Sequence, residues 1–166
     1  VLFRSAGSPA GLLEVAQREH VDLTVVGPEL PLSLGIADLF AQKGYAIVGP
    51  TRDAAALESS KAFAKDFMAR HAVPTAQFEV CGSAAAARAA IARGHFGYPL
   101  VLKADGLAAG KGVVIAEDRK AAERAVEMAM VDRRFGAAGD SLVLEEFLVG
   151  EEASYFVLAD GTEYMA

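Results

Sequence analysis

The sequence predicts an α/β protein that begins with part of a doubly wound parallel sheet and continues into a separate α+β unit. Two observations support this division. In the first third of the chain, helical apolar patterns alternate with short apolar strands, whereas from about Ala76 the order is strand–helix–strand–strand–helix–strand. The composition, 53% hydrophobic and 23% charged over 166 residues, is typical of a globular protein with one or two domains.

Four segments form the predicted parallel part. Helices are expected over 9–20 and over 32–44, the second ending at Gly44 as its C-terminal cap. Strands are expected within 21–29 and 45–50. A strand, a helix and a strand joined by short links require parallel pairing through a right-handed crossover.

Two short helices are expected next. The first covers 51–59 and begins with a threonine cap, and the second begins at Ser60 and stops before Pro74. Lys61 and Lys65 are four residues apart on this second helix. From the pattern alone we interpret the two lysines as part of a solvated face.

The remaining segments form the predicted α+β unit and the start of a further sheet. Strands are expected over 76–80, 98–105, 112–117 and 141–148, and helices over 83–94 and 118–130, with serine and aspartate caps. A strand, a turn at Asp160-Gly161 and the beginning of a partner strand follow within 150–166. We therefore divide the chain into 1–77, 78–149 and 150–166.

Charge and reactive side chains exclude several classes of protein. The net charge is -6 and the isoelectric point about 5.1, so no nucleic-acid partner is expected. A single cysteine, Cys81, excludes an intramolecular disulfide and is interpreted as a small apolar residue near a strand end. No apolar run approaches the roughly 20 residues of a membrane helix, and no signal peptide is visible. We expect a cytoplasmic protein without a membrane partner.

The stretch "VLKADGLAAGKGVV" combines a strand, a glycine-rich loop and a second strand. It is not a Walker A loop, because Lys111 is followed by glycine and a strand instead of Ser or Thr and a helix. Lys103 lies in an apolar strand, where its ammonium group is costly unless it reaches water or an anion. Glycines supply unobstructed backbone N–H donors, so the unit suits a hairpin loop that closes over phosphates. The alternative is a mobile hairpin with an edge lysine.

The stretch "LVLEEFLVGEE" places acidic residues at the end of an apolar strand. Its backbone N–H and C=O groups could pair with an adenine edge, and a carboxylate a few residues later could accept hydrogen bonds from ribose hydroxyls. A strand end with solvated glutamates is the alternative.

Together these motifs resemble the ATP-grasp superfamily of carboxylate–amine ligases. More narrowly, "GPE.PL", "VGPT", "LE.SKAFAKDFM.RH.VPTA", "VLKADGLAAGKGV" and "EEFL.GEEAS" are similar to phosphoribosylamine–glycine ligases, also called glycinamide ribonucleotide synthetases, of purine biosynthesis. The resemblance runs from about Pro9 to the C-terminus and leaves out Val1–Ser5. It implies a partial N-terminal substrate domain over 1–77, an ATP-grasp lid over 78–149 and the beginning of the ATP-grasp core over 150–166.

The resemblance also implies an ATP site. Lys61 and Lys103 would contact phosphates, with Lys103 stabilising charge in the transition state, and the loop would close over the triphosphate with Lys111 as a mobile cation. Glu145, with the backbone of the residues after it, would hold adenine, and Glu152 would hold the ribose. The expected ATP-binding residues are Lys61, Lys103, Asp105, Gly106, Leu107, Ala108, Ala109, Gly110, Lys111, Gly112, Glu145, Glu146, Phe147, Leu148 and Glu152.

The implied reaction activates glycine as an acyl phosphate at the expense of ATP, and the amine of 5-phosphoribosylamine then displaces phosphate. Such chemistry needs charge neutralisation and alignment more than a protein nucleophile. Ligands for Mg²⁺ or Mn²⁺ are expected beyond Ala166, so no metal ligand is expected in this chain. Glu29, at the end of a strand, is a candidate substrate contact, with a simple turn residue as the alternative.

We expect the chain to be an internal piece of a larger ligase and to be inactive alone, with other purine-pathway enzymes as candidate partners. Two alternatives stay open. One is another ATP-grasp ligase or carboxylase, such as a biotin-dependent or a purine carboxylase. The other is a non-catalytic nucleotide-binding module.

Overall fold

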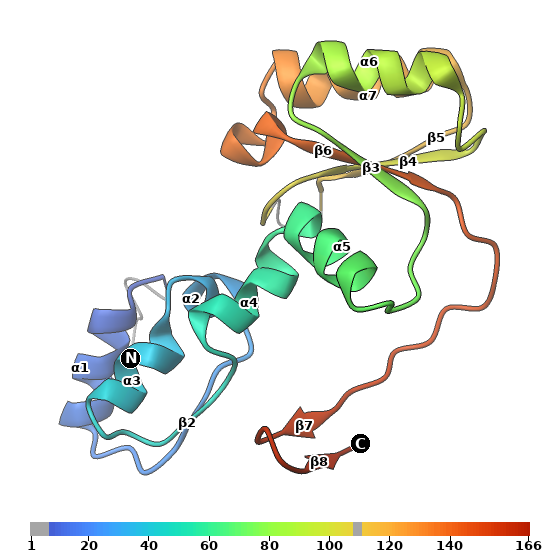
Figure 1. The fold of residues 1–166 in the computed structure, drawn as a ribbon. Coiled ribbons are helices and arrows are strands. Elements are labelled where there is room, and N and C mark those ends of the chain that lie inside the picture. Colours follow the sequence, from blue (N-terminus) through green and yellow to red (C-terminus); the bar gives the residue numbers. More distant parts are fainter. Residues whose placement is uncertain (1–6, 108–110) are drawn as a thin grey trace.

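The computed structural model describes residues 7–107 and 111–166, which form an N-terminal α/β unit, a helix-covered sheet and an extended C-terminal segment (Figure 1). The N-terminal unit consists of α1 (Pro9–Arg18), β1 (Thr24–Val25), α2 (Glu29–Ser33), α3 (Ile36–Gln42) and β2 (Ile47–Val48). Strands β1 and β2 pair in parallel, with Thr24 opposite Ile47, which confirms the predicted parallel pairing. Leu13, Ile36 and Phe40 are buried in the core of this unit.

One helix of this unit differs from its prediction. The segment expected as a single helix over 32–44 is split at Gly35 into α2 and α3. Gly35 has a φ of 81°, which lies in the left-handed region and interrupts a right-handed helix. Gly44, with a φ of 77°, follows the end of α3 as the cap prediction requires.

Two helices connect the N-terminal unit to the sheet, as predicted. They are α4 (Arg52–Ser59) and α5 (Lys61–Arg70), separated only by Ser60 in an extended conformation. The hydroxyl of Thr51 caps α4 by accepting from the backbone N–H of Ala54, and Ser60 caps α5 in the same way. Helix α4 packs against α2 and α5 packs against the sheet, so the two helices bridge the two units (Figure 1).

The second unit is a four-stranded antiparallel sheet in the order β3-β6-β4-β5. Its elements along the chain are β3 (Phe78–Cys81), α6 (Ala84–Arg93), β4 (Leu100–Ala104), β5 (Val113–Ala116), α7 (Arg119–Val126) and β6 (Leu142–Glu146). This order confirms the predicted strand–helix–strand–strand–helix–strand unit, and Ser83 and Asp118 cap the two helices as expected. The second helix is shorter than predicted, because regular α-helix ends at Val126.

A π-helical turn (Glu127–Val131) and a 3₁₀ turn (Gly136–Asp140) occupy the connection from α7 to β6. This connection returns the chain to the edge of β4 beside the glycine loop, where Asp105 donates its backbone N–H to the carbonyl of Ser141. The two irregular turns therefore help to fix the position of the loop root.

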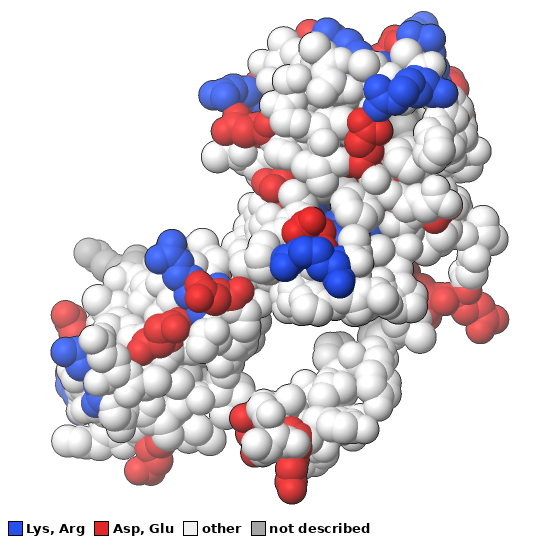
Figure 2. Space-filling view, viewed as in Figure 1, with Lys and Arg blue, Asp and Glu red and all other residues white. Residues whose placement is uncertain are grey.

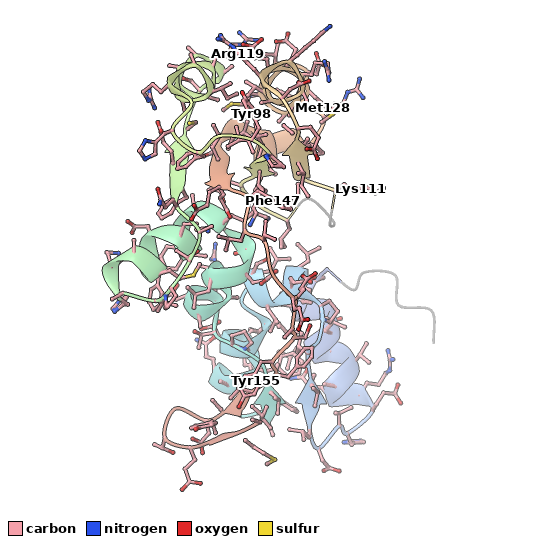
Figure 3. All side chains as sticks on the ribbon, turned by 90° about the vertical axis from the view of Figure 1, so that its right-hand side faces the viewer. Tyr98, Lys111, Arg119, Met128, Phe147 and Tyr155 are labelled. Carbon is pink, nitrogen blue, oxygen red and sulfur yellow. The ribbon has the colours of Figure 1, made fainter. Side chains whose placement is uncertain are left out.

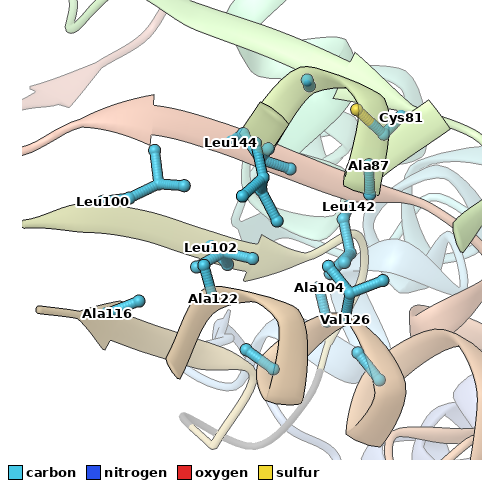
Figure 4. Packing of buried hydrophobic residues seen from close by; sticks show 14 residues of the cluster. Cys81, Ala87, Leu100, Leu102, Ala104, Ala116, Ala122, Val126, Leu142 and Leu144 are labelled. Carbon is cyan, nitrogen blue, oxygen red and sulfur yellow. The ribbon is translucent and has the colours of Figure 1, made fainter. Parts of the chain in front are cut away.

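The sheet has one face covered by α6 and α7 and the other by α5 (Figure 1). Leu100 and Leu102 of β4 and Leu142 and Leu144 of β6 point to the first face and form its core (Figure 4). Alanines of α6 and α7 pack against them, which allows the helices to approach the sheet closely. Because side chains alternate along a strand, Lys103 and its neighbours two residues apart point to the α5 face.

The C-terminal segment after β6 is extended and carries a small hairpin, β7 (Leu158–Ala159) and β8 (Tyr164–Met165), around the predicted turn. At this turn the Asp160 carboxylate accepts hydrogen bonds from the backbone N–H groups of Glu163 and Thr162, which lower its pKa to about 2. Apolar side chains along the segment, including Tyr155, are exposed (Figure 3).

Basic and acidic side chains are interspersed over the face seen in Figure 2, which shows no large area of a single charge. Among the described residues, no helix combines the length and the apolar character that crossing a membrane requires.

Candidate functional site

A cluster of three charged side chains, two of which are buried, lies between helix α5 and the sheet. In the register of β4 against β6, Val101 faces Glu145, so Lys103 lies two residues along on the same face as Glu145. The Lys103 ammonium is 2.9 Å from Glu145 Oε2. In this structure, the anion that compensates Lys103 in its apolar strand is a carboxylate of the neighbouring strand.

The third member of the cluster is Lys65 of α5, whose ammonium lies 3.0 Å from the same Glu145 oxygen. Its side chain is 7% exposed, so the interpretation of Lys65 as part of a solvated face was wrong. A sequence signal for burial existed, because Lys61, Ala64, Lys65 and Met68 have the i, i+3, i+4, i+7 spacing of a buried helical stripe. The strand that would supply the partner carboxylate lies 80 residues away in sequence, beyond the reach of a local pattern.

A second set of contacts joins the start of α5 to the root of the glycine loop. The Asp105 carboxylate accepts from the Ser60 hydroxyl at 3.0 Å and from the Ala62 backbone N–H at 3.1 Å. The Lys61 ammonium donates to the Gly106 carbonyl at 2.9 Å. A carboxylate at the N-terminal end of a helix is stabilised by unpaired N–H groups and by the helix dipole. Asp105, whose expected role is in ATP binding, thus anchors the loop to α5 in this structure.

The loop root also packs on the 3₁₀ turn before β6. Gly106 has a φ of 134°, and a Cβ there would lie 3.1 Å from Ala138 Cβ, so only glycine fits this position well. Gly139 follows Ala138 in the 3₁₀ turn. It packs so tightly on the π-helical turn that a Cβ on it would lie 2.1 Å from the Ala129 carbonyl oxygen. Sequence inspection missed Ala138 and Gly139, because they are remote from the loop along the chain.

The glycine loop connects β4 and β5 as an antiparallel hairpin, as predicted. Gly112 closes the hairpin by accepting from the Ala104 backbone N–H at 2.7 Å. Leu107 and Lys111 are exposed on either side of the loop, and Lys111 lies at the sheet edge remote from α6 and α7 (Figure 3). The expected contacts of Ala108, Ala109 and Gly110 lie outside the described residues.

The end of β6 is fixed to the segment that links α5 to β3. Glu146 donates its backbone N–H to the Gln77 carbonyl at 3.1 Å, and its carboxylate accepts from the Gln77 N–H at 2.8 Å. Beyond it, Phe147 (labelled in Figure 3), Leu148 and Glu152 are exposed. Phe147 follows the end of β6 that pairs with Leu100, which is the end of β4 remote from the glycine loop. The acidic motif and the glycine loop therefore lie at opposite ends of β4, and the Lys103–Glu145 ion pair lies between them.

Glu29 lies apart from this cluster. It is the first residue of α2 and is exposed in the N-terminal unit, in a helix start instead of the expected strand-end turn. Within the described ranges, no group of three or more His, Cys, Asp or Glu side chains could hold a metal ion. No residue of the described chain is therefore assigned to a metal.

Cys81 is the other reactive side chain near the sheet. It is buried at the end of β3, and burial, helped by the nearby Glu79 carboxylate, raises the pKa of its thiol. A buried thiol with a raised pKa is mostly protonated and unreactive, which agrees with the apolar role predicted for it.

A lysine on a strand, a glycine hairpin beside it and a covering helix with two further lysines form the arrangement that the resemblance to ATP-grasp ligases predicts. Two family descriptions match the chain: "Phosphoribosylglycinamide synthetase, N domain" over residues 4–58 and "Phosphoribosylglycinamide synthetase, ATP-grasp (A) domain" over residues 59–166. The chain belongs to the phosphoribosylglycinamide synthetase family.

Curated relatives agree with this assignment. The chain is 55% identical over 158 residues to a phosphoribosylamine–glycine ligase of Ralstonia nicotianae and 51% identical over 157 residues to that of Allochromatium vinosum. The matches cover 95% of this chain but 37% and 36% of those proteins. The chain thus spans a little over a third of the length of these relatives.

Solved structures show the same fold. The crystal structure of phosphoribosylamine–glycine ligase from Thermotoga maritima matches with a TM-score of 0.70 at 30% identity, over 86% of this chain and 34% of that one. Biotin carboxylase from Campylobacter jejuni, solved as a complex with β,γ-ATP, matches with a TM-score of 0.71 over 88% of this chain and 34% of that one. Its identity of 23% supports a shared fold alone.

Proposed function

We propose that the protein containing this chain is an ATP-dependent ligase that joins glycine to 5-phosphoribosylamine in purine biosynthesis. The observation that carries this proposal is the match of both family domains, in order, to a chain whose sheet places Lys103 beside the glycine hairpin. The proposal includes the cytoplasm as its location, Mg²⁺ or Mn²⁺ as the accompanying metal and other purine-pathway enzymes as candidate partners.

The proposed reaction has two steps. A glycine carboxylate oxygen bonds to the γ-phosphorus of ATP as the bond from that phosphorus to the β–γ bridging oxygen breaks, which gives glycyl phosphate and ADP. The amine nitrogen of phosphoribosylamine then bonds to the acyl carbon and loses a proton, as phosphate leaves with the electrons of the carbon–oxygen bond.

Residues of this chain would serve the nucleotide in these steps. Lys103 would stabilise charge on the phosphates and the hairpin loop would cover them, because fixed cations and backbone donors stabilise phosphoryl transfer. The Lys61 ammonium already donates to the Gly106 carbonyl at the loop root, and it would also contact the phosphates. Glu145 and the segment after it, with Glu152, would hold the nucleoside. Glu29 remains a candidate substrate contact in the N-terminal unit.

Release of ADP by the full-length protein tests the proposal. It should require ATP, glycine and phosphoribosylamine together, and Lys103→Ala should lower the rate about a hundredfold, as loss of a group that stabilises transition-state charge typically does. Lys120→Ala, which removes an exposed lysine from α7 on the opposite face, serves as the matched control.

Two results would contradict the proposal. ADP release driven by bicarbonate without glycine would indicate an ATP-grasp carboxylase. Full function of Lys103→Ala would instead indicate a non-catalytic nucleotide-binding module.

A further inference from the structure

Two lysines share one oxygen of a single buried carboxylate in this structure. Glu145 Oε2 lies 3.0 Å from the Lys65 ammonium and 2.9 Å from the Lys103 ammonium. Within the part of the chain that the structure describes, the buried Oε1 of Glu145 has no hydrogen-bond partner. One carboxylate thus faces two cations through one oxygen, which is more positive charge than a structural ion pair requires.

The two lysines differ in their surroundings. The Lys103 side chain is 29% exposed, whereas the Lys65 side chain is 7% exposed. Lys65 also donates to the Thr75 hydroxyl at 2.7 Å and to the Ala76 carbonyl at 3.4 Å, and its ammonium lies 5.6 Å from the centre of the Phe78 ring. An ammonium group has three N–H donors, and Lys65 uses all three on fixed groups. Lys65 is therefore held in place, and Lys103 is the lysine with access to solvent.

This difference has an electrostatic consequence if Lys103 leaves Glu145 for another anion. Glu145 is 4% exposed, and a buried carboxylate that loses its only cation is strongly destabilised. With Lys65 in place, the carboxylate keeps one cation at 3.0 Å after Lys103 has moved. Without Lys65, the attraction between Glu145 and Lys103 would oppose that movement.

We propose that Lys65 is a positioning residue, which neutralises Glu145 from the buried side so that Lys103 can exchange this carboxylate for a nucleotide phosphate. The inference rests on the proposed function, because it takes Lys103 as the lysine that binds phosphate. It adds a role for a lysine that is buried between α5 and the sheet.

A double-mutant cycle on the affinity for ATP tests this role. The dissociation constant for ATP in the presence of Mg²⁺ is measured on the full-length protein for the parent, Lys65→Met, Lys103→Met and the double variant. Lys65→Met should weaken ATP binding about tenfold in the parent but less than about twofold in the Lys103→Met background. The exposed Lys120→Met is the matched control and should leave the constant unchanged.

A loss of ATP affinity in Lys65→Met that depends on the presence of Lys103 separates the proposed role from a structural one. If Lys65 only supported the fold, its removal would weaken binding equally in both backgrounds, and that result would overturn the inference. An unchanged ATP affinity in Lys65→Met would overturn it as well. If Lys103→Met itself bound ATP as tightly as the parent, the phosphate role of Lys103 would fail, which is a failure of the proposed function.

The double variant leaves the buried Glu145 carboxylate without Lys65 and Lys103, the two cations that the structure places on it, which is strongly destabilising, so a second pair of variants protects the test against a failure to fold. Lys65→Met combined with Glu145→Gln removes the buried charge together with its fixed counter-ion, which is tolerated better than removing one partner. Against Glu145→Gln alone, this variant should show no further loss of ATP affinity, because no carboxylate remains to hold Lys103. A further loss of several-fold would overturn the inference.

Discussion

Replacement of Gly139 by alanine tests how the 3₁₀ turn before β6 sets the geometry of the glycine loop. A Cβ at this position would lie 2.1 Å from the Ala129 carbonyl oxygen, and it would have to move about 0.9 Å to reach even 3.0 Å. The obstructing atom belongs to the backbone of the π-helical turn, not to a flexible side chain. The 3₁₀ turn must therefore move away from that turn.

The expected cost follows from this displacement. Overpacking a core typically costs 1–3 kcal/mol, and an obstruction by backbone places Gly139→Ala at the upper end, about 3 kcal/mol. For a chain of about 150–250 residues, each kcal/mol lowers the melting temperature by roughly 2–4 °C, so a decrease of about 6–12 °C is expected. Because Ala138 packs against Gly106, the same movement should disturb the loop root and weaken ATP binding.

Thermal unfolding followed by circular dichroism measures this effect, with Gly82→Ala as the matched control. Gly82 has open space around its Cβ position and no left-handed φ, so alanine there should leave the melting temperature unchanged or slightly raised. The reasoning is refuted if Gly139→Ala melts within about 2 °C of the parent, or if both variants lose the same stability.

Two further predictions concern the sheet unit. Asp118→Ala should lower the free energy of unfolding by about 1 kcal/mol in urea titrations, because the Asp118 carboxylate caps α7 at 2.7 Å from the Ala121 N–H. Asp118→Ser should retain most of that stability, and equal losses in the two variants would contradict the capping role. Cys81 should react slowly with a thiol reagent at pH 7–8 in the folded protein and quickly in denaturant. Its raised pKa leaves little thiolate below that pKa, so the native rate should climb as pH rises; a fast native reaction at pH 7 would contradict the burial argument.

Local signals in the sequence were sufficient for the order and type of most elements. Helix caps at Thr51, Ser60, Ser83 and Asp118 act between residues three apart, so their effect is visible in short stretches. The alternation of side chains along the strand "LVLKA" is equally local, and it places Leu100 and Leu102 on one face and Lys103 on the other. Two helices were predicted too long, because Gly35 interrupts the pattern over 32–44 and the π-helical turn ends the regular α-helix α7.

The sequence by itself determined where candidate nucleotide-binding residues occur, since the glycines, lysines and glutamates of the loop and the acidic motif lie in contiguous segments. Tertiary structure alone decided what those residues contact. Lys65 faces Glu145 because α5 crosses the sheet at β6, Asp105 binds the start of α5, and Gly139 meets the π-helical turn. These contacts join positions far apart along the chain, and long-range packing, which a short sequence pattern does not contain, selects them.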